Sequence, residues 1–307
     1  MKRIGIVGLC LAAMFAMSAV AASSAFAASG QPAWFECAKV AKVTVKYTEK
    51  GKEKSKAITE GKYSNAACTE LAPTPGKYIS GPEGKYELQE GVAKGKKAKT
   101  KDGIGILNTV IPTLGNINDK VECASSKSEN SVANAGGRGF VSDLVVHFSK
   151  CKSQGEPCQT STKKEEIVTN ALAGELGYIN KGGDVVGLEL WNEANPGTGY
   201  LAEFTCTKVA AIRTLGSVIG EVTGDVGAIS KTSTTTYASS TYFGAITEGP
   251  FTWEPLVNIP SFEGEAVDVL STEFNTGSGY EPSGGLPSGQ NDTAANTGEA
   301  LGIYEGV

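Results

Sequence analysis

Cysteine is the residue type that most constrains what this chain can fold into. The 307 residues contain seven cysteines, and Cys10 alone lies in an N-terminal segment that we expect to be removed. An even set of cysteines behind an export signal is typical of a secreted protein held together by disulfides. The sequence therefore predicts three disulfides, formed by Cys37, Cys68, Cys123, Cys151, Cys158 and Cys206.

The first 27 residues have the parts of a secretory signal peptide. Lys2 and Arg3 provide the positive start, residues 4–20 are apolar and small, and residues 25–27 fit the small-x-small cleavage rule. An uncleaved anchor is the alternative. No later stretch approaches the roughly 20 apolar residues that a membrane span needs. We expect residues 28–307 to be exported to the extracellular space or the cell envelope, with no membrane span after cleavage.

Spacing and strand ends favour one of the 15 pairings that six cysteines allow. Cys151 and Cys158 flank a turn-forming stretch, KSQGEP, that can close on itself. Cys37 pairs with Cys68 at the next strand-like stretch, which leaves Cys123 for Cys206. The sequence therefore predicts Cys37–Cys68, Cys123–Cys206 and Cys151–Cys158.

Short alternating segments dominate the rest of the chain. Residues 43–47, 140–148 and 186–190 place apolar side chains at every second position, and turn-forming residues separate such segments. Glycine, with 39 residues, is well above its usual ~7% share. This pattern predicts a mainly β fold, an antiparallel β-sandwich or an irregular β-barrel, built as a single domain over residues 28–307.

Two segments lack the large apolar residues that a core requires. Residues 90–101 are rich in lysine, and residues 277–297 are rich in Gly, Ser, Pro and Asn. Both compositions are typical of mobile loops, and we predict loops there. Residues 300–304 regain apolar character and are expected to form a final strand.

Charge is unevenly distributed along the sequence. Residues 31–101 contain 15 lysines and 8 acidic residues, whereas residues 208–307 contain 3 basic and 12 acidic residues. The basic part lacks arginine, which argues against nucleic acid as a partner. This uneven charge has three interpretations: solvated lysine-rich loops, attraction to an anionic cell-wall polymer, or attraction between the two halves.

Motifs for catalysis or metal binding are missing from the sequence. His147 is the sole histidine, and in a strand it would lie about 13 Å from Asp143, too far for a direct bond. No zinc, calcium, nucleotide or nucleophile-elbow spacing occurs, so we expect no cofactor and no metal. Paired carboxylates remain as a catalytic option: Glu175, Glu189, Glu193 and Glu203.

One short region combines aromatic and polar residues in the manner of a ligand-contact surface. Trp191 alternates away from the apolar face of its strand, and a loop with Glu193 and two asparagines leads to Tyr200. Aromatic rings stack on sugar rings, and the neighbouring polar groups suit adaptable hydrogen bonds. We therefore predict Trp191, Glu193 and Tyr200 as ligand-binding residues, against the alternative of a solvated strand face.

Six phrases of the sequence together resemble a paralogous family of secreted proteins of soil actinobacteria of the Solirubrobacter type. They are 31–37 (QPAWFEC), 61–68 (GKYSNAAC), 84–88 (GKYEL), 166–170 (EIVTN), 172–179 (LAGELGYI) and 216–220 (GSVIG). The resemblance covers most of residues 28–307 and implies no activity, substrate or catalytic residue. The size of such a family suits extracellular recognition.

The sequence therefore favours a non-enzymatic protein that is secreted or envelope-associated and that binds a surface component or serves a structural role. A secreted carbohydrate-active hydrolase using two of the glutamates is the alternative. An inhibitor or toxin-like factor is a third.

Overall fold

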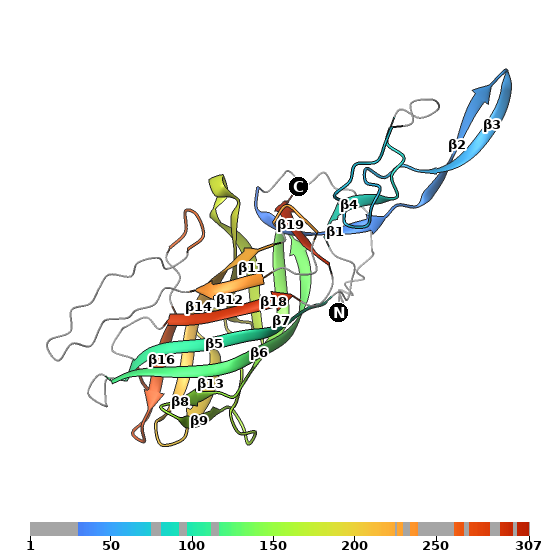
Figure 1. Ribbon diagram of the computed structural model, residues 1–307. Coiled ribbons are helices and arrows are strands. Elements are labelled where there is room, and N and C mark those ends of the chain that lie inside the picture. The colour runs from blue at the N-terminus through green and yellow to red at the C-terminus, as the bar shows by residue number, and fades with distance from the viewer. Residues whose placement is uncertain are drawn as a thin grey trace, which may run out of the picture.

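The computed structural model describes residues 30–74, 81–91, 97–111, 117–224, 226–229, 234–238, 261–266, 270–282, 289–296 and 300–306. Strands make up nearly all regular structure in these ranges, and the exception is the short helix η2 (Lys181–Gly183). The ladders between strands are antiparallel. The prediction of a mainly β fold is confirmed (Figure 1).

Eight strands pair in a closed ring. Each pairs with the next, and the last pairs with the first. Closure satisfies the backbone of both edges, so the fold is the irregular barrel of the two predicted arrangements. In ring order the strands are β5 (Lys97–Ile111), β6 (Ile117–Ala135), β7 (Arg138–Ser149), β11 (Leu172–Asn180), β12 (Val185–Asn192), β14 (Ala210–Thr223), β15 (Thr234–Ala238) and β18 (Gly289–Asn296).

One end of the ring is extended by short strands. The long β14 pairs with β12 and β15 along its second half, and with β13 (Tyr200–Cys206) and β16 (Leu270–Asn275) along its first half. The other additions are β8 (Lys152–Ser153), β9 (Glu156–Gln159), β10 (Glu166–Val168) and β17 (Glu281–Pro282). Of these four strands, β9 and β8 link β13 to β6.

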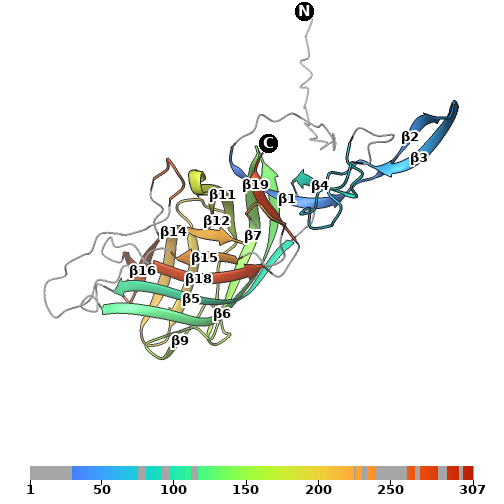
Figure 2. The ribbon, with the colours of Figure 1, turned by 45° about the horizontal axis from the view of Figure 1, so that its top comes forward.

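A smaller sheet and a hairpin lie beside the ring. The sheet has the order β19–β1–β4, formed by Gly302–Glu305, Pro32–Lys39 and Tyr86–Glu90. The hairpin pairs β2 (Lys42–Glu49) with β3 (Lys52–Thr59) and projects away from the ring (Figures 1 and 2). Lys50 and Gly51 both have positive φ, the backbone of a tight two-residue hairpin turn.

Trp34 in β1 joins the small sheet to the ring. Its indole is 6% exposed and donates a hydrogen bond to the Phe140 carbonyl at 3.1 Å. The Asn134 side chain pairs with both backbone groups of Trp34, at 2.9 and 2.8 Å. Trp34 belongs to the same core cluster as Leu176 and Ile303, so one apolar core spans both sheets.

The disulfide prediction is correct for one bridge and wrong for two. Cys37–Cys68 is present, whereas the other bridges are Cys123–Cys151 and Cys158–Cys206. The β6–β7 register, in which Ser125 faces Ser149, continues to bring Cys123 opposite Cys151. Cys158 and Cys206 are direct register partners of β9 and β13. Cross-strand register therefore decided the pairing, and proximity along the chain did not.

The two loop predictions are wrong where strands cover them. Lys97–Lys101 begin β5, although their composition is polar, and Gly289–Asn296 form β18. Both segments gain backbone hydrogen bonds from ring neighbours, β6 for the first and β5 and β15 for the second. Such pairing does not require large apolar side chains. Residues 92–96, 283–288 and the predicted signal peptide, 1–27, lie outside the described residues.

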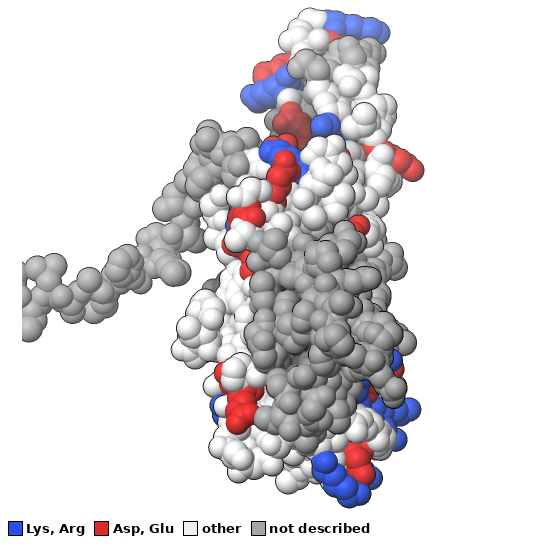
Figure 3. Space-filling view, turned by 90° about the vertical axis from the view of Figure 1, so that its left-hand side faces the viewer, with Lys and Arg blue, Asp and Glu red and all other residues white. Residues whose placement is uncertain are grey.

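The uneven charge of the sequence does not produce two separate fields on the face shown in Figure 3. There the described basic and acidic side chains lie close to one another. Within the hairpin, ion pairs join opposite charges, for example Lys46–Glu53 and Lys54–Glu49, at 3.2 and 2.6 Å. The part of the chain that is described contains no helix with the length and hydropathy of a membrane span.

Candidate functional site

Trp191, the first of the three predicted ligand-binding residues, lies near the end of β12 on the outer face of the ring. Its neighbours on the same strand, Leu188 and Leu190, are 8% and 5% exposed and belong to the core. Trp191 itself is half-buried beside Ala173 and Ser217, its cross-strand partners. The predicted alternation is therefore present, and the Trp191 side chain is only partly exposed.

The loop after Trp191 is folded around a buried asparagine. Asn192 is 6% exposed, accepts a hydrogen bond from the Asn195 N–H at 2.8 Å and donates one to the Tyr200 carbonyl at 2.7 Å. Glu193 turns back toward β7, where its carboxylate accepts a hydrogen bond from the Asp143 N–H at 3.2 Å. Asn192 thus closes the loop, and Glu193 ties it to the neighbouring strand.

Tyr200 packs against an arginine that the sequence analysis did not single out. The Arg213 guanidinium lies 4.4 Å from the centre of the Tyr200 ring and 3.6 Å from that of Tyr280. The Glu203 carboxylate accepts hydrogen bonds from Arg213 at 2.9 Å and from the Tyr280 hydroxyl at 3.0 Å. Burial and this carboxylate raise the pKa of Tyr280, so its hydroxyl stays a donor. Tyr200 therefore belongs to a polar cluster that fastens β13 to β14.

We expect Arg213→Lys to lower the free energy of unfolding by about 1–2 kcal/mol, because a lysine cannot stack between two rings or form the forked bond to Glu203. Urea denaturation measures the change. Lys208→Ala is the control, since it removes only an exposed ion pair to Glu156, and we expect it to change the free energy of unfolding much less. Equal effects of the two changes would contradict a stabilising role for the stacked arginine.

The four glutamates considered for catalysis are engaged with different partners. Glu175 pairs with Arg138 and lies opposite Glu189, while Glu193 and Glu203 have the contacts given above. Neither the interior cavity nor the surface groove described below includes any of them among its lining residues. The hydrolase alternative therefore gains no support from their placement.

His147 lies on β7 with its imidazole Nδ1 3.7 Å from the Glu166 carboxylate. That carboxylate also accepts a hydrogen bond from Lys163 at 2.6 Å, and mainly this bond lowers the pKa of Glu166. The His147 partner is thus Glu166 rather than Asp143. Within the described ranges, no three His, Cys, Asp or Glu side chains group closely enough to hold a metal ion.

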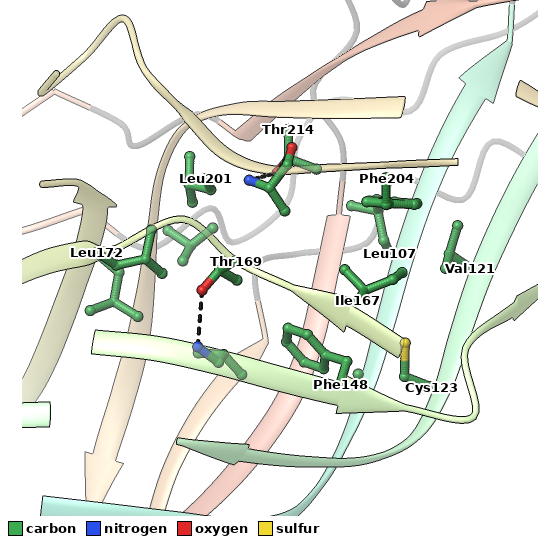
Figure 4. Close-up of a pocket in the computed structure, with 15 residues that line it drawn as sticks. Leu107, Val121, Cys123, Phe148, Ile167, Thr169, Leu172, Leu201, Phe204 and Thr214 are labelled. Carbon is green, nitrogen blue, oxygen red and sulfur yellow. Dashed lines mark hydrogen bonds between the residues drawn. The ribbon is translucent and has the colours of Figure 1, made fainter. Parts of the chain in front are cut away.

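An apolar cavity of about 90 Å³ lies inside the ring. Its walls come from β5, β6, β7 and β10 on one side and from β11, β12, β13 and β14 on the other. Figure 4 shows side chains such as Leu107, Ile167 and Phe204 directed toward this shared space. Two small residues line it: Gly105, where a Cβ would lie 2.7 Å from the Phe148 ring, and Ala202 on the opposite wall.

Two threonines are the polar side chains of the cavity wall, and each hydroxyl already accepts a backbone hydrogen bond. The Thr169 hydroxyl accepts a hydrogen bond from the Val146 N–H at 2.9 Å, and the Thr214 hydroxyl accepts one from the Ala202 N–H at 3.0 Å (Figure 4). Each threonine satisfies a backbone group near a register shift in the sheet. The wall therefore offers little to a polar guest, and an apolar guest fits it better.

Sequence reasoning missed both the cavity and Arg213. The one available signal for the cavity was a threonine, Thr214, at a buried position of an otherwise apolar strand face. For Arg213 no signal was singled out: Glu203 is its partner in the β13–β14 hairpin, whereas Tyr280 is 67 positions away. No family model, curated protein or solved structure matches this chain.

Proposed function

We propose that this chain is a non-enzymatic, secreted or envelope-associated binding protein whose strand ring receives a small apolar molecule or a short apolar group of a larger one. The observation that carries the proposal is the apolar cavity inside a closed ring of eight strands. Rings of this size have an interior that side chains fill or that holds one small ligand. The three disulfides support export, because such bonds persist in oxidising compartments.

The volume of the cavity restricts the ligand. About 90 Å³ is roughly three times the ~30 Å³ share of a water molecule in the liquid, and less than the ~150 Å³ of a cavity known to hold benzene. A short alkyl group or a comparably small hydrocarbon matches this size. An unfilled cavity of this volume costs about 2 kcal/mol of stability relative to a filled core, and a bound ligand recovers part of that cost.

The test is a titration of the purified protein with xenon, cyclopropane and benzene, followed through the methyl signals of Leu201 and Val218 by NMR. We expect saturable shifts at these cavity-lining methyls and a higher melting temperature, with the smaller probes binding more readily than benzene. Ala202→Leu fills the cavity, so it is expected to abolish the shifts and to raise the free energy of unfolding by up to about 2 kcal/mol.

Ala211→Leu is the matched control, because Ala211 lies on the neighbouring strand and points to the outer face. It is expected to leave the shifts unchanged. The proposal fails if no apolar probe shifts these methyls in the folded protein, or if the shifts persist in Ala202→Leu.

A further inference from the structure

A second, separate feature of the molecule is a groove at the base of the β2–β3 hairpin. We call it the hairpin groove, and it has a volume of about 400 Å³. Its lining residues are Lys39, Val40, Lys42, Lys56, Ala57, Ile58, Thr59, Glu83 and Lys85. It lies where β1 leads into β2, on the part of the molecule that projects from the ring (Figures 1 and 2).

The backbone beneath the hairpin groove is tightly built. Gly61 and Gly84 exchange two hydrogen bonds, at 3.0 and 2.7 Å, and the Val40 N–H donates to the Lys85 carbonyl at 2.9 Å. A Cβ on Gly84 would lie 2.3 Å from the Gly61 carbonyl, so only glycine permits this crossing. The nearby Cys37–Cys68 disulfide joins the same segments. The groove is therefore a fixed surface rather than a gap between loose strands.

The groove carries an excess of positive charge. Four of its lining residues are lysines and one is a glutamate. Glu83 pairs with Lys56 at 2.9 Å. Lys39, Lys42 and Lys85 are exposed, and among the described residues none of them forms an ion pair. Three ammonium groups are thus left to face an external anion.

The residue types of the groove indicate the class of anion. Lysine ammonium groups act as mobile point charges that suit any carboxylate or phosphate, whereas arginine would favour forked, specific pairing. The lining contains no aromatic residue on which a nucleic acid base could stack. A groove whose lysines come from separate segments of the chain suits a flexible polymer with repeated charges better than one compact anion.

We propose that the hairpin groove binds an anionic carbohydrate or polyol polymer that carries carboxylate or phosphate groups. Lys39, Lys42 and Lys85 supply the attraction, and the half-buried Val40 side chain adds an apolar part to the lining. Binding is weak per charge and sensitive to salt, as expected for exposed ammonium groups. The site is independent of the interior cavity.

The proposal is tested by measuring how the purified protein binds two immobilised polymers over 25–300 mM salt. One is polygalacturonate, which bears carboxylates, and the other is a poly(glycerol phosphate) chain. We expect binding at low salt that falls steeply as salt rises. The triple variant Lys39→Gln/Lys42→Gln/Lys85→Gln is expected to weaken it roughly tenfold or more. Binding to only one of the two polymers also supports the proposal and identifies the anionic group.

The matched control is Lys127→Gln/Lys150→Gln/Lys164→Gln, which removes the same charge from exposed positions of the ring and its extension. It is expected to change binding less than twofold. Three results would overturn the proposal: no binding of either polymer at low salt, an equal loss in both triple variants, or tighter binding of single-stranded DNA than of either polymer. Because all six lysines are exposed, equal melting temperatures verify that the variants fold.

Discussion

Replacing both Cys158 and Cys206 by alanine is expected to lower the free energy of unfolding by about 4 kcal/mol or more. Their bridge closes a sequence separation of 48 residues, for which loop entropy alone gives about 4 kcal/mol. The two cysteines are also 0% and 1% exposed and lie in a core cluster with Phe204 and Ile212. Their loss therefore leaves a small void as well. Urea denaturation of the variant and the parent protein measures the effect.

The matched control is the double replacement of Cys37 and Cys68. Its sequence separation of 31 residues predicts a similar entropic loss, again about 4 kcal/mol. Cys37 is only half-buried, so the additional cost of a void is smaller there. A loss below about 1 kcal/mol for Cys158 and Cys206 would show that their bridge does not hold the extension of the ring together.

Trp34→Ala is expected to lower the free energy of unfolding by about 3–5 kcal/mol, the usual cost of removing a buried indole. The change empties the space between β1 and the ring, and it leaves the Phe140 carbonyl without its 3.1 Å donor. Urea denaturation, followed by circular dichroism because an indole is lost, checks the value.

Trp34→Phe serves as the control, since it keeps most of the packing and loses the hydrogen bond, at a cost of about 1–2 kcal/mol. If residues 28–307 form a single domain, we expect each variant to unfold in one transition. If Trp34→Ala instead unfolds in two steps, with the ring unaffected in the second, then β1, β4 and β19 form a separate folding unit and the single-domain prediction is wrong.

Local alternation located strands, but it gave the buried face only in part: Val43 is 41% exposed, and in β7 Val141, not Phe140, is buried beside a register shift. Val186, Leu188 and Leu190 are buried as their spacing predicts, and residues 300–304 do contribute the last strand. The segments that failed, 97–101 and 289–296, are strands whose polar sequences carry no apolar period. Their strand conformation comes from backbone pairing with ring neighbours, which is a property of the whole closed ring and not of the segment.

Long-range relations account for the remaining errors. Cys123 and Cys151 meet because the β6–β7 hairpin continues in register, and the sequence contains no mark of that register. In the same way, Arg213 meets Tyr280 through the β14–β16 pairing and the turn after it. The prediction of Tyr200 selected one member of this cluster by its composition; its ring packs against Arg213, and its role in ligand binding stays a prediction.

The cavity was beyond sequence reasoning for a related reason. Each lining residue, such as Leu107 or Val218, is an ordinary inward-facing residue of its own strand. Alternation predicts which side chains point inward, but it does not give the volume that remains when they meet. That volume depends on small residues on facing strands, Gly105 and Ala202, which are 97 positions apart in the sequence.

The most direct test of the binding proposal is a crystal structure of the protein under xenon pressure. Xenon binds apolar cavities of this kind and needs no polar partner. We predict one strong xenon peak inside the ring, in contact with Leu107, Phe204 and Val218, and no such peak in Ala202→Leu crystals. A ring interior filled by side chains, or by ordered water bonded to Thr169 and Thr214, would contradict it.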